Sequence, residues 1–218
     1  MYFNGRLFLK AQSLTLFRTP FRFRRWVYVF FFSGLFLVFL AMIVLGRALD
    51  RIFFPRFRRQ AVRAPVFIVA PPRSGTTLLQ GLLAADEERF AHLKMYQTIF
   101  PCICYQRLFA GLGWIDRRLG RPIHRLLEWC EKRWFDGWED MHKMRLDQPE
   151  EDGALFLYAF ESEAIFLLFP FIDELWEAGF PDTLLREERR KLMKSYRGWL
   201  QRHLYANGPG KTVLSKSF

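Results

Sequence analysis

The longest apolar stretch in the chain is a run of twenty residues without a charge. It extends from Trp26 to Leu45 and reads WVYVFFFSGLFLVFLAMIVL. A helix of this length spans about 30 Å, the thickness of the hydrocarbon core of a bilayer. Trp26 and Tyr28 lie at one end, where aromatic rings favour the membrane interface. The run therefore predicts one N-terminal transmembrane helix over about 26–45.

A buried core helix and a cleaved signal peptide also contain apolar runs, but each fits this segment less well. A buried core helix rarely extends over twenty residues without a polar residue other than one serine. The apolar region of a signal peptide is usually about 7–15 residues long and is followed by a small-residue cleavage site. No such site follows the run before Arg47.

A second short apolar run begins after Pro65. The segment VFIVA at 66–70 is β-branched and uncharged, which is typical of a buried strand in a parallel sheet. Pro71 and Pro72 end it, because proline cannot donate to the strand ladder. The sequence RSGTT at 73–77 and the helical pattern LLQGLLAADEE follow. The order strand, tight loop, helix predicts an α/β domain over 64–218, with a P-loop-like parallel sheet flanked by helices.

Three further segments show helical patterns. Residues 104–135 and 186–205 have apolar spacing with charged outer faces. The segment 154–171 is strongly apolar but contains Glu161 and Glu163, which favours a buried or acceptor-lining helix over a second membrane span.

Charge is distributed unevenly along the 218 residues. The formal net charge is +11, and residues 1–63 contain twelve basic side chains and a single acid, Asp50. The excess flanks the apolar run, so membrane lipids with anionic headgroups are a better partner than nucleic acid. An aromatic content of 18% excludes a disordered chain, and three cysteines are too few for a disulfide framework. We expect a basic N-terminal region with its anchor over 1–63.

The loop at 73–77 has the composition of an oxyanion site. The first N–H groups of a helix lack intrahelical partners and carry the positive end of the helix dipole. Gly75 permits close approach of the backbone, and Arg73 supplies a planar cationic fork. Ser74, Thr76 and Thr77 add hydroxyl donors. The alternative is a capped helix whose polar side chains are merely solvated.

The loop differs from the motif of nucleoside triphosphatases. That motif, G-x-x-x-x-G-K-[ST], requires a glycine where Ala70 stands and a lysine where Thr76 stands. No G-x-G-x-x-G fingerprint of dinucleotide-binding proteins occurs either.

Three segments in order resemble the sulfotransferases that use 3′-phosphoadenosine 5′-phosphosulfate (PAPS), in their membrane-associated and bacterial branch. The first is PRSGTT with its preceding strand, which resembles the 5′-phosphosulfate loop. The second is WEDMHKMRLDQPEED at 138–152, which resembles a histidine followed by Pro-Glu-Glu-Asp. The third is KTVLSKS at 211–217, which resembles the strand with Leu-x-Lys-Ser.

The resemblance implies binding of PAPS as co-substrate and transfer of its sulfuryl group to a hydroxyl or amine. It implies donor binding by the loop and by the end of the last strand, and it places His142 near the acceptor as the candidate base. No metal is expected. For Lys216, a solvated strand end is an equally weighted alternative. The candidate donor-binding residues are Arg73, Ser74, Gly75, Thr76, Thr77, Lys216 and Ser217, and the candidate catalytic residues are His142 and Arg73.

The chain departs from this family at its last residues. Phe218 stands where a proline usually follows Lys-Ser, and no further strand–helix unit is present to supply the Arg and Ser that hold the 3′-phosphate. We therefore expect a sulfotransferase-like domain that is incomplete at its C-terminus.

The function expected from these features is that of a membrane-anchored sulfotransferase with a lipid or glycan acceptor. The alternatives are a nucleotide-binding, kinase-like P-loop protein and a non-catalytic membrane-tethered module. Six basic residues precede the apolar run and six follow it, so the positive-inside rule gives no orientation. We expect a single-pass membrane protein with a cytoplasmic catalytic domain.

Overall fold

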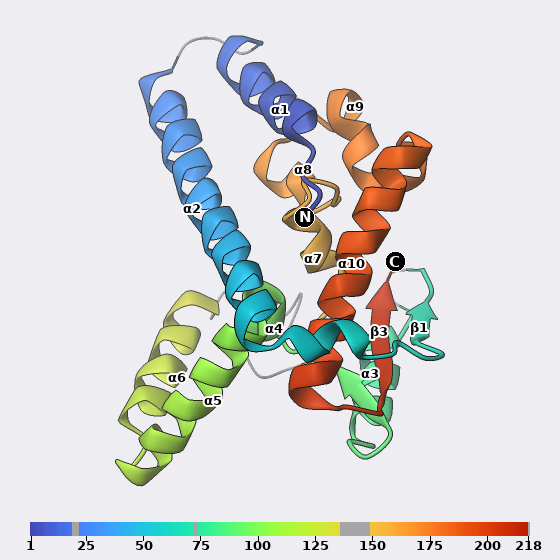
Figure 1. Ribbon diagram of the computed structural model, residues 1–218. Coiled ribbons are helices and arrows are strands. Elements are labelled where there is room, and N and C mark those ends of the chain that lie inside the picture. The colour runs from blue at the N-terminus through green and yellow to red at the C-terminus, as the bar shows by residue number, and fades with distance from the viewer. Residues whose placement is uncertain (19–21, 72–73, 136–148, 218) are drawn as a thin grey trace.

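The computed structural model describes residues 1–18, 22–71, 74–135 and 149–217. Its helices are α1 (Gly5–Phe17), α2 (Phe23–Phe53), α3 (Thr76–Ala84), α4 (Met95–Ile99), α5 (Ile103–Arg118), α6 (Pro122–Phe135), α7 (Gly153–Leu157), α8 (Ile165–Leu168), α9 (Ile172–Leu175) and α10 (Arg186–Asn207), with short 3-10 helices η1 (Pro55–Arg59), η2 (Trp176–Gly179) and η3 (Pro181–Thr183). Its strands are β1 (Val66–Val69), β2 (Phe90–His92) and β3 (Thr212–Ser217). In Figure 1, α2 forms one side of the molecule, and the sheet and α10 form the other.

The three strands form a small parallel sheet in the order β1-β3-β2. Strands form at both predicted segments, with β3 central between β1 and β2. The expected burial of the first strand is wrong, because β1 lies at the edge of the sheet and its Val66, Phe67 and Val69 are exposed. Because successive residues of a strand point to opposite faces, Leu214 lies against α3 and Val213 lies against α10. The predicted α/β fold with a parallel sheet flanked by helices is therefore correct.

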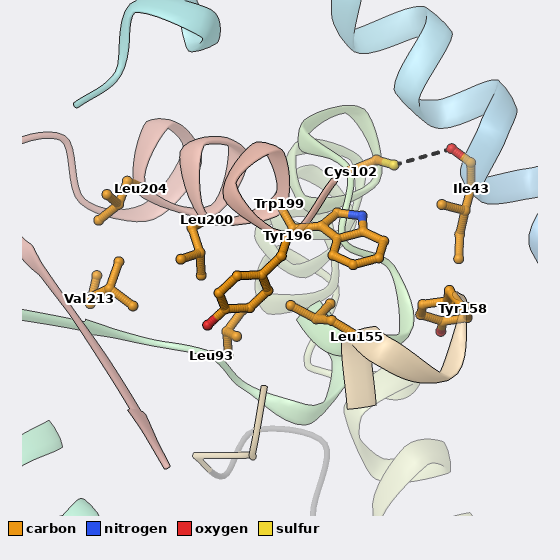
Figure 2. Close-up of a cluster of buried hydrophobic side chains, with 11 residues drawn as sticks. Ile43, Leu93, Cys102, Leu155, Tyr158, Tyr196, Trp199, Leu200, Leu204 and Val213 are labelled. Atoms are coloured by element: carbon orange, nitrogen blue, oxygen red, sulfur yellow. Dashed lines mark hydrogen bonds between the residues drawn. The ribbon is translucent and has the colours of Figure 1, made fainter. Parts of the chain in front are cut away.

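The main core joins α10 to the sheet and to α2. Figure 2 shows Trp199 of α10 between Cys102, which immediately precedes α5, and Leu155 of α7. Ile43 of α2 is part of the same cluster, and its carbonyl oxygen accepts a hydrogen bond from Cys102 Sγ at 3.6 Å. The long apolar helix thus contributes directly to the core of the domain.

One face of α2 is buried along most of its length. Val29, Phe36, Ile43 and Asp50 are at most 7% exposed and lie seven residues apart. A repeat of seven keeps these side chains on one face of a helix. Near the N-terminus this face packs on α1 and on the phenylalanine-rich cluster of α8 and α9. The division into residues 1–63 and 64–218 remains a prediction, although the two parts share this packing.

The single acid of the N-terminal region joins three helices. Asp50 is fully buried, and its Oδ2 accepts hydrogen bonds from Arg202 Nε at 2.8 Å and from the Ile103 N–H at 3.1 Å. Its Oδ1 accepts from the Cys104 N–H at 2.9 Å. The carboxylate therefore forms a salt bridge to α10 and satisfies two amides in the first turn of α5, which otherwise lack partners.

The apolar segment 154–171 is not one helix, contrary to the prediction. α7 ends at Leu157 and α8 begins at Ile165, with Phe160 between them at φ +57°. A left-handed residue with a large side chain interrupts a helix, and it is tolerated here because Phe160 is fully buried in the aromatic cluster.

The interruption between α7 and α8 places Glu161 in contact with the N-terminal residues of the chain. Its Oε1 accepts hydrogen bonds from Asn4 Nδ2 at 2.7 Å and from the Tyr2 hydroxyl at 3.3 Å. The Tyr2 N–H donates to Ser195 Oγ at 3.0 Å, which ties the same segment to α10. Burial raises the pKa of Glu161 to about 7, although the bonds from Asn4 and Tyr2 act in the opposite direction.

We expect Asp50→Ala to lower the free energy of unfolding by about 3–5 kcal/mol, because it leaves the Arg202 guanidinium buried without its partner. Denaturant unfolding of the whole chain in detergent measures the change. Asp182→Asn is the matched control, since the Asp182 side chain is 97% exposed, and its effect should stay within about 0.5 kcal/mol. Equal losses in the two variants would contradict the role of Asp50.

We expect Glu161 to contribute a loss of stability as the pH rises from about 5 to about 7, while the buried His203, whose pKa is lowered to about 4, contributes with the opposite sign below about 6.5. The folded pKa of Glu161 lies above its ordinary value, so the folded chain binds a proton that the unfolded chain releases over this range. In Glu161→Gln, the part of the decrease in the free energy of unfolding that comes from Glu161 should be absent. This part is on the order of 1–3 kcal/mol, since one pKa unit corresponds to about 1.4 kcal/mol. Unfolding of Glu187→Gln, in which the altered side chain is exposed, should keep the pH dependence of the unmodified protein.

Candidate functional site

The site begins where β1 turns into α3. Gly75 occupies the position before the helix at φ +81°, a conformation that favours glycine, and α3 starts at Thr76. The Ser74 hydroxyl donates to the Pro71 carbonyl at 2.7 Å, which closes the loop on itself. No side chain caps the first turn of α3 among the residues that the structure describes. Its amides therefore present the positive end of the helix to an approaching anion.

Lys216 of β3 reaches this helix terminus from the neighbouring strand. It pairs in register with Ile68 of β1 and points to the face of the sheet that α3 covers. Its Nζ donates to Thr77 Oγ1 at 3.2 Å and lies 2.8 Å from Glu151 Oε1. Lys216 is 2% exposed, so the structure excludes the alternative of a solvated strand end.

The acidic segment at 149–152 is held in place by contacts on both sides. The Glu150 N–H donates to the Leu93 carbonyl at 2.8 Å, and Gln80 Nε2 of α3 donates to the Glu150 carbonyl at 3.4 Å. The buried Asp152 accepts a hydrogen bond from the Tyr196 hydroxyl of α10, while its burial raises the pKa of its carboxyl. These contacts fix Glu151, whose side chain is 21% exposed, beside Lys216.

The structure thus brings together residues of the three sequence segments. Thr77 comes from the loop segment, Glu151 from the acidic segment and Lys216 from the last strand. The ion pair of Glu151 with Lys216 was not predicted, since residues 65 positions apart show no local pattern. The available signals were an uninterrupted acidic triplet at 150–152 and, far along the sequence, a short motif containing lysine at 211–217.

The remaining candidate residues are placed as follows. Ser74, Gly75 and Thr76 lie at the turn into α3, and Thr76 is buried. Ser217 ends β3 opposite Val69 of β1, at the carboxyl edge of the sheet. Arg73 and His142 lie outside the described residues.

The electrostatics of this arrangement favour an anionic ligand. A buried ammonium group and a helix N-terminus converge at one edge of the sheet, and Glu151 forms an ion pair with the ammonium. Phosphate or sulfonate oxygens could take the place of that carboxylate as acceptors. Within the described residues, His, Cys, Asp and Glu side chains form no group of three suited to a metal ion.

A family model described as the sulfotransferase family matches residues 65–170. The matched segment contains β1, the loop, α3 and the acidic segment with Glu151. A search of curated protein sequences gave no match.

Two solved structures share the fold. The chain is similar to sulfotransferase STF1 from Mycobacterium tuberculosis, with 17% identity, a TM-score of 0.61, and coverage of 97% of this chain and 54% of that one. It is similar to sulfotransferase STF9 from Mycobacterium avium, with 16% identity, a TM-score of 0.63, and coverage of 99% and 52%. The chain therefore spans about half the length of the structures it matches. The family model matches slightly less than half of this chain, and together with the shared fold it supports the assignment of the chain to a sulfotransferase family.

Proposed function

We propose that this protein takes part in transfer of a sulfuryl group from PAPS to a hydroxyl or amine acceptor. The observation that carries the proposal is the convergence of Lys216, Thr77 and the N-terminus of α3 at one edge of the sheet. The membrane-associated and bacterial branch of the family is the one that the three sequence segments resemble.

Lys216, Thr77 and the N-terminus of α3 each have a proposed role in this reaction. Sulfuryl transfer resembles phosphoryl transfer, in which an in-line attack spreads charge over the equatorial oxygens of the transferred group. The α3 amides and the hydroxyls of Thr76 and Thr77 would hold the 5′-phosphosulfate, and Lys216 would stabilise charge on the oxygen that leaves. Arg73 and Ser217 are proposed to complete this set.

The proton of the acceptor must pass to a base as the new bond to sulfur forms. His142 is the proposed base, because imidazole titrates near neutral pH and the Pro-Glu-Glu-Asp segment follows it closely in sequence. Its placement within the acceptor site is part of the proposal.

Attachment to a membrane is the second part of the proposal. Within the described residues, α2 is the helix that is long and apolar enough to cross a bilayer, and its Phe30 and Phe31 are more than 60% exposed. A single crossing, a cytoplasmic catalytic domain and a lipid or membrane-associated glycan as acceptor are proposed on this basis.

We expect the protein to bind adenosine 3′,5′-bisphosphate, the nucleotide product of PAPS, without magnesium. Calorimetry should show affinity at least about tenfold weaker for Thr77→Ala and for Arg73→Ala, a loss of about 1.4 kcal/mol or more. Lys216→Ala should weaken binding further, since it removes the buried cation. Lys191→Ala, at an exposed lysine of α10, is the control and should bind as the unmodified protein does.

Thermal unfolding of each variant separates loss of binding from loss of fold. Unchanged affinity in both Thr77→Ala and Arg73→Ala would overturn the donor site. Magnesium-dependent binding of ATP would favour a kinase-like protein instead, and the absence of binding to either nucleotide would favour a non-catalytic module.

We expect radiolabelled sulfate from PAPS to appear in a lipid or glycolipid when the protein is reconstituted in vesicles. His142→Ala should lower the rate by about 10²–10⁴-fold with little change in nucleotide affinity, as removal of a general base does. Turnover confined to small soluble phenols would contradict the proposed acceptor class.

A further inference from the structure

α5 and α6 form a helical hairpin whose turn is built by specific hydrogen bonds. Asp116 is buried, and its carboxylate accepts from the Ile123 N–H at 2.7 Å and the His124 N–H at 3.2 Å, in the first turn of α6. Its carbonyl accepts from the Arg121 N–H at 2.8 Å, and Gly120 takes φ +81°. The turn is thus fixed by its own side chain and backbone, and the two helices are held as one unit.

This hairpin exposes large apolar side chains along both helices. Leu112 and Trp114 of α5 and Ile123 and Leu126 of α6 are all between 42% and 59% exposed. Leu119 at the turn is 70% exposed and Trp129 is 64% exposed. Exposed apolar side chains gathered on one hairpin indicate a surface that another phase or molecule covers.

Basic side chains accompany the apolar ones. Arg107, Arg117, Arg118, Arg121 and Arg125 are all exposed. The hairpin has three acids: Asp116, which accepts the hydrogen bonds of the turn, Glu128, which lies 3.5 Å from His124, and Glu131. The Arg118 guanidinium lies 4.3 Å from the centre of the Trp114 ring. Tryptophan and leucine beside arginine with few acids are typical of helices that lie at an anionic bilayer surface.

The hairpin starts beside the helix that we propose enters the membrane. The Tyr105 hydroxyl of α5 donates to the Met42 carbonyl of α2 at 2.7 Å. A Cβ on Gly46 would meet the Tyr105 ring at 2.6 Å, so the two helices approach closely there. In Figure 1, α5 and α6 continue from the C-terminal end of α2 on the same side of the molecule, away from the sheet.

The length of α2 supports contact of the hairpin with the same bilayer. Apolar side chains are exposed from Phe23 to Phe53, and a helix of 31 residues extends about 46 Å, well beyond the roughly 30 Å of hydrocarbon. The charge-free part of the helix, from Trp26 to Leu45, matches that thickness, so the remaining turns at its C-terminal end, beside which α5 starts, would lie at the leaflet surface.

We propose that the α5–α6 hairpin is a second membrane-binding element, which inserts its apolar side chains into a leaflet rich in anionic lipids. The proposal rests on the membrane attachment of α2. We identify the binding partner of the hairpin as the bilayer because the hairpin surface is basic as well as apolar and adjoins the apolar helix α2.

Spin labels at three introduced cysteines test this in the whole chain, reconstituted in vesicles of phosphatidylcholine and phosphatidylglycerol. The sites are Leu119→Cys at the hairpin turn, Phe31→Cys on α2 and Glu187→Cys on the exposed surface of α10, in a background with Cys104→Ser and Cys130→Ser. Cys102 is fully buried and stays. Collision with dissolved oxygen reports the bilayer, and collision with a water-soluble nickel complex reports the aqueous phase.

The label at Leu119 should collide several-fold more with oxygen relative to nickel than the label at Glu187, and the difference should shrink in vesicles of phosphatidylcholine alone. Collision at Leu119 equal to that at Glu187, with Phe31 in the bilayer, would overturn the hairpin proposal and leave the α2 anchor intact. A Leu119 label shielded from both reagents would also overturn it, since a second copy or another polypeptide would then cover the hairpin. A Phe31 label in water would refute the anchor itself.

Discussion

The fold depends most on the buried carboxylate of Asp50. An ion withdrawn from water loses several kcal/mol of solvation, and this loss is offset when strong hydrogen bonds replace the lost waters. Asp50 receives three such bonds, from Arg202 and from two backbone amides at the start of α5. Because the donors come from two separate helices, the carboxylate fixes α2, α5 and α10 relative to one another.

The same constraint extends to the edge of the sheet that forms the candidate site. α10 leads through a short turn into β3, and β3 carries Lys216. Trp199, one helical turn before Arg202, packs in the core that includes Ile43 of α2. The position of the buried ammonium is therefore tied to the long apolar helix through continuous side-chain packing.

Local sequence patterns were sufficient to locate β1, β3 and the start of α3 but insufficient for the contacts between elements. The strand at 66–69 and the helix from Thr76 are set by β-branched residues, prolines and a glycine, all within a few positions. The pairing of Lys216 with Glu151 depends on how the chain returns to the sheet, which periodicity does not encode. Two short helices replace the predicted helix at 154–171, because the N-terminal segment binds Glu161 and the aromatic cluster holds Phe160. Tertiary contacts there prevailed over local helical preference.

The connection between α2 and β1 also bears on how the site would meet an acceptor. Gln201 Nε2 of α10 donates to the carbonyls of Arg58 and Gln60 at 3.1 and 3.0 Å, and the Arg202 guanidinium lies 4.1 Å from the centre of the Phe57 ring. The connection is thus bound to α10, whereas a flexible linker would let the domain move freely. With α2 in a bilayer, the edge of the sheet would stand at a set distance from the membrane. An acceptor would then have to present its hydroxyl or amine at that height, so geometry as well as chemistry would select the substrate. If the proposed attachment holds, a glycan or headgroup of matching length would meet this condition, while a shorter lipid would not bring its nucleophile within reach of the proposed donor.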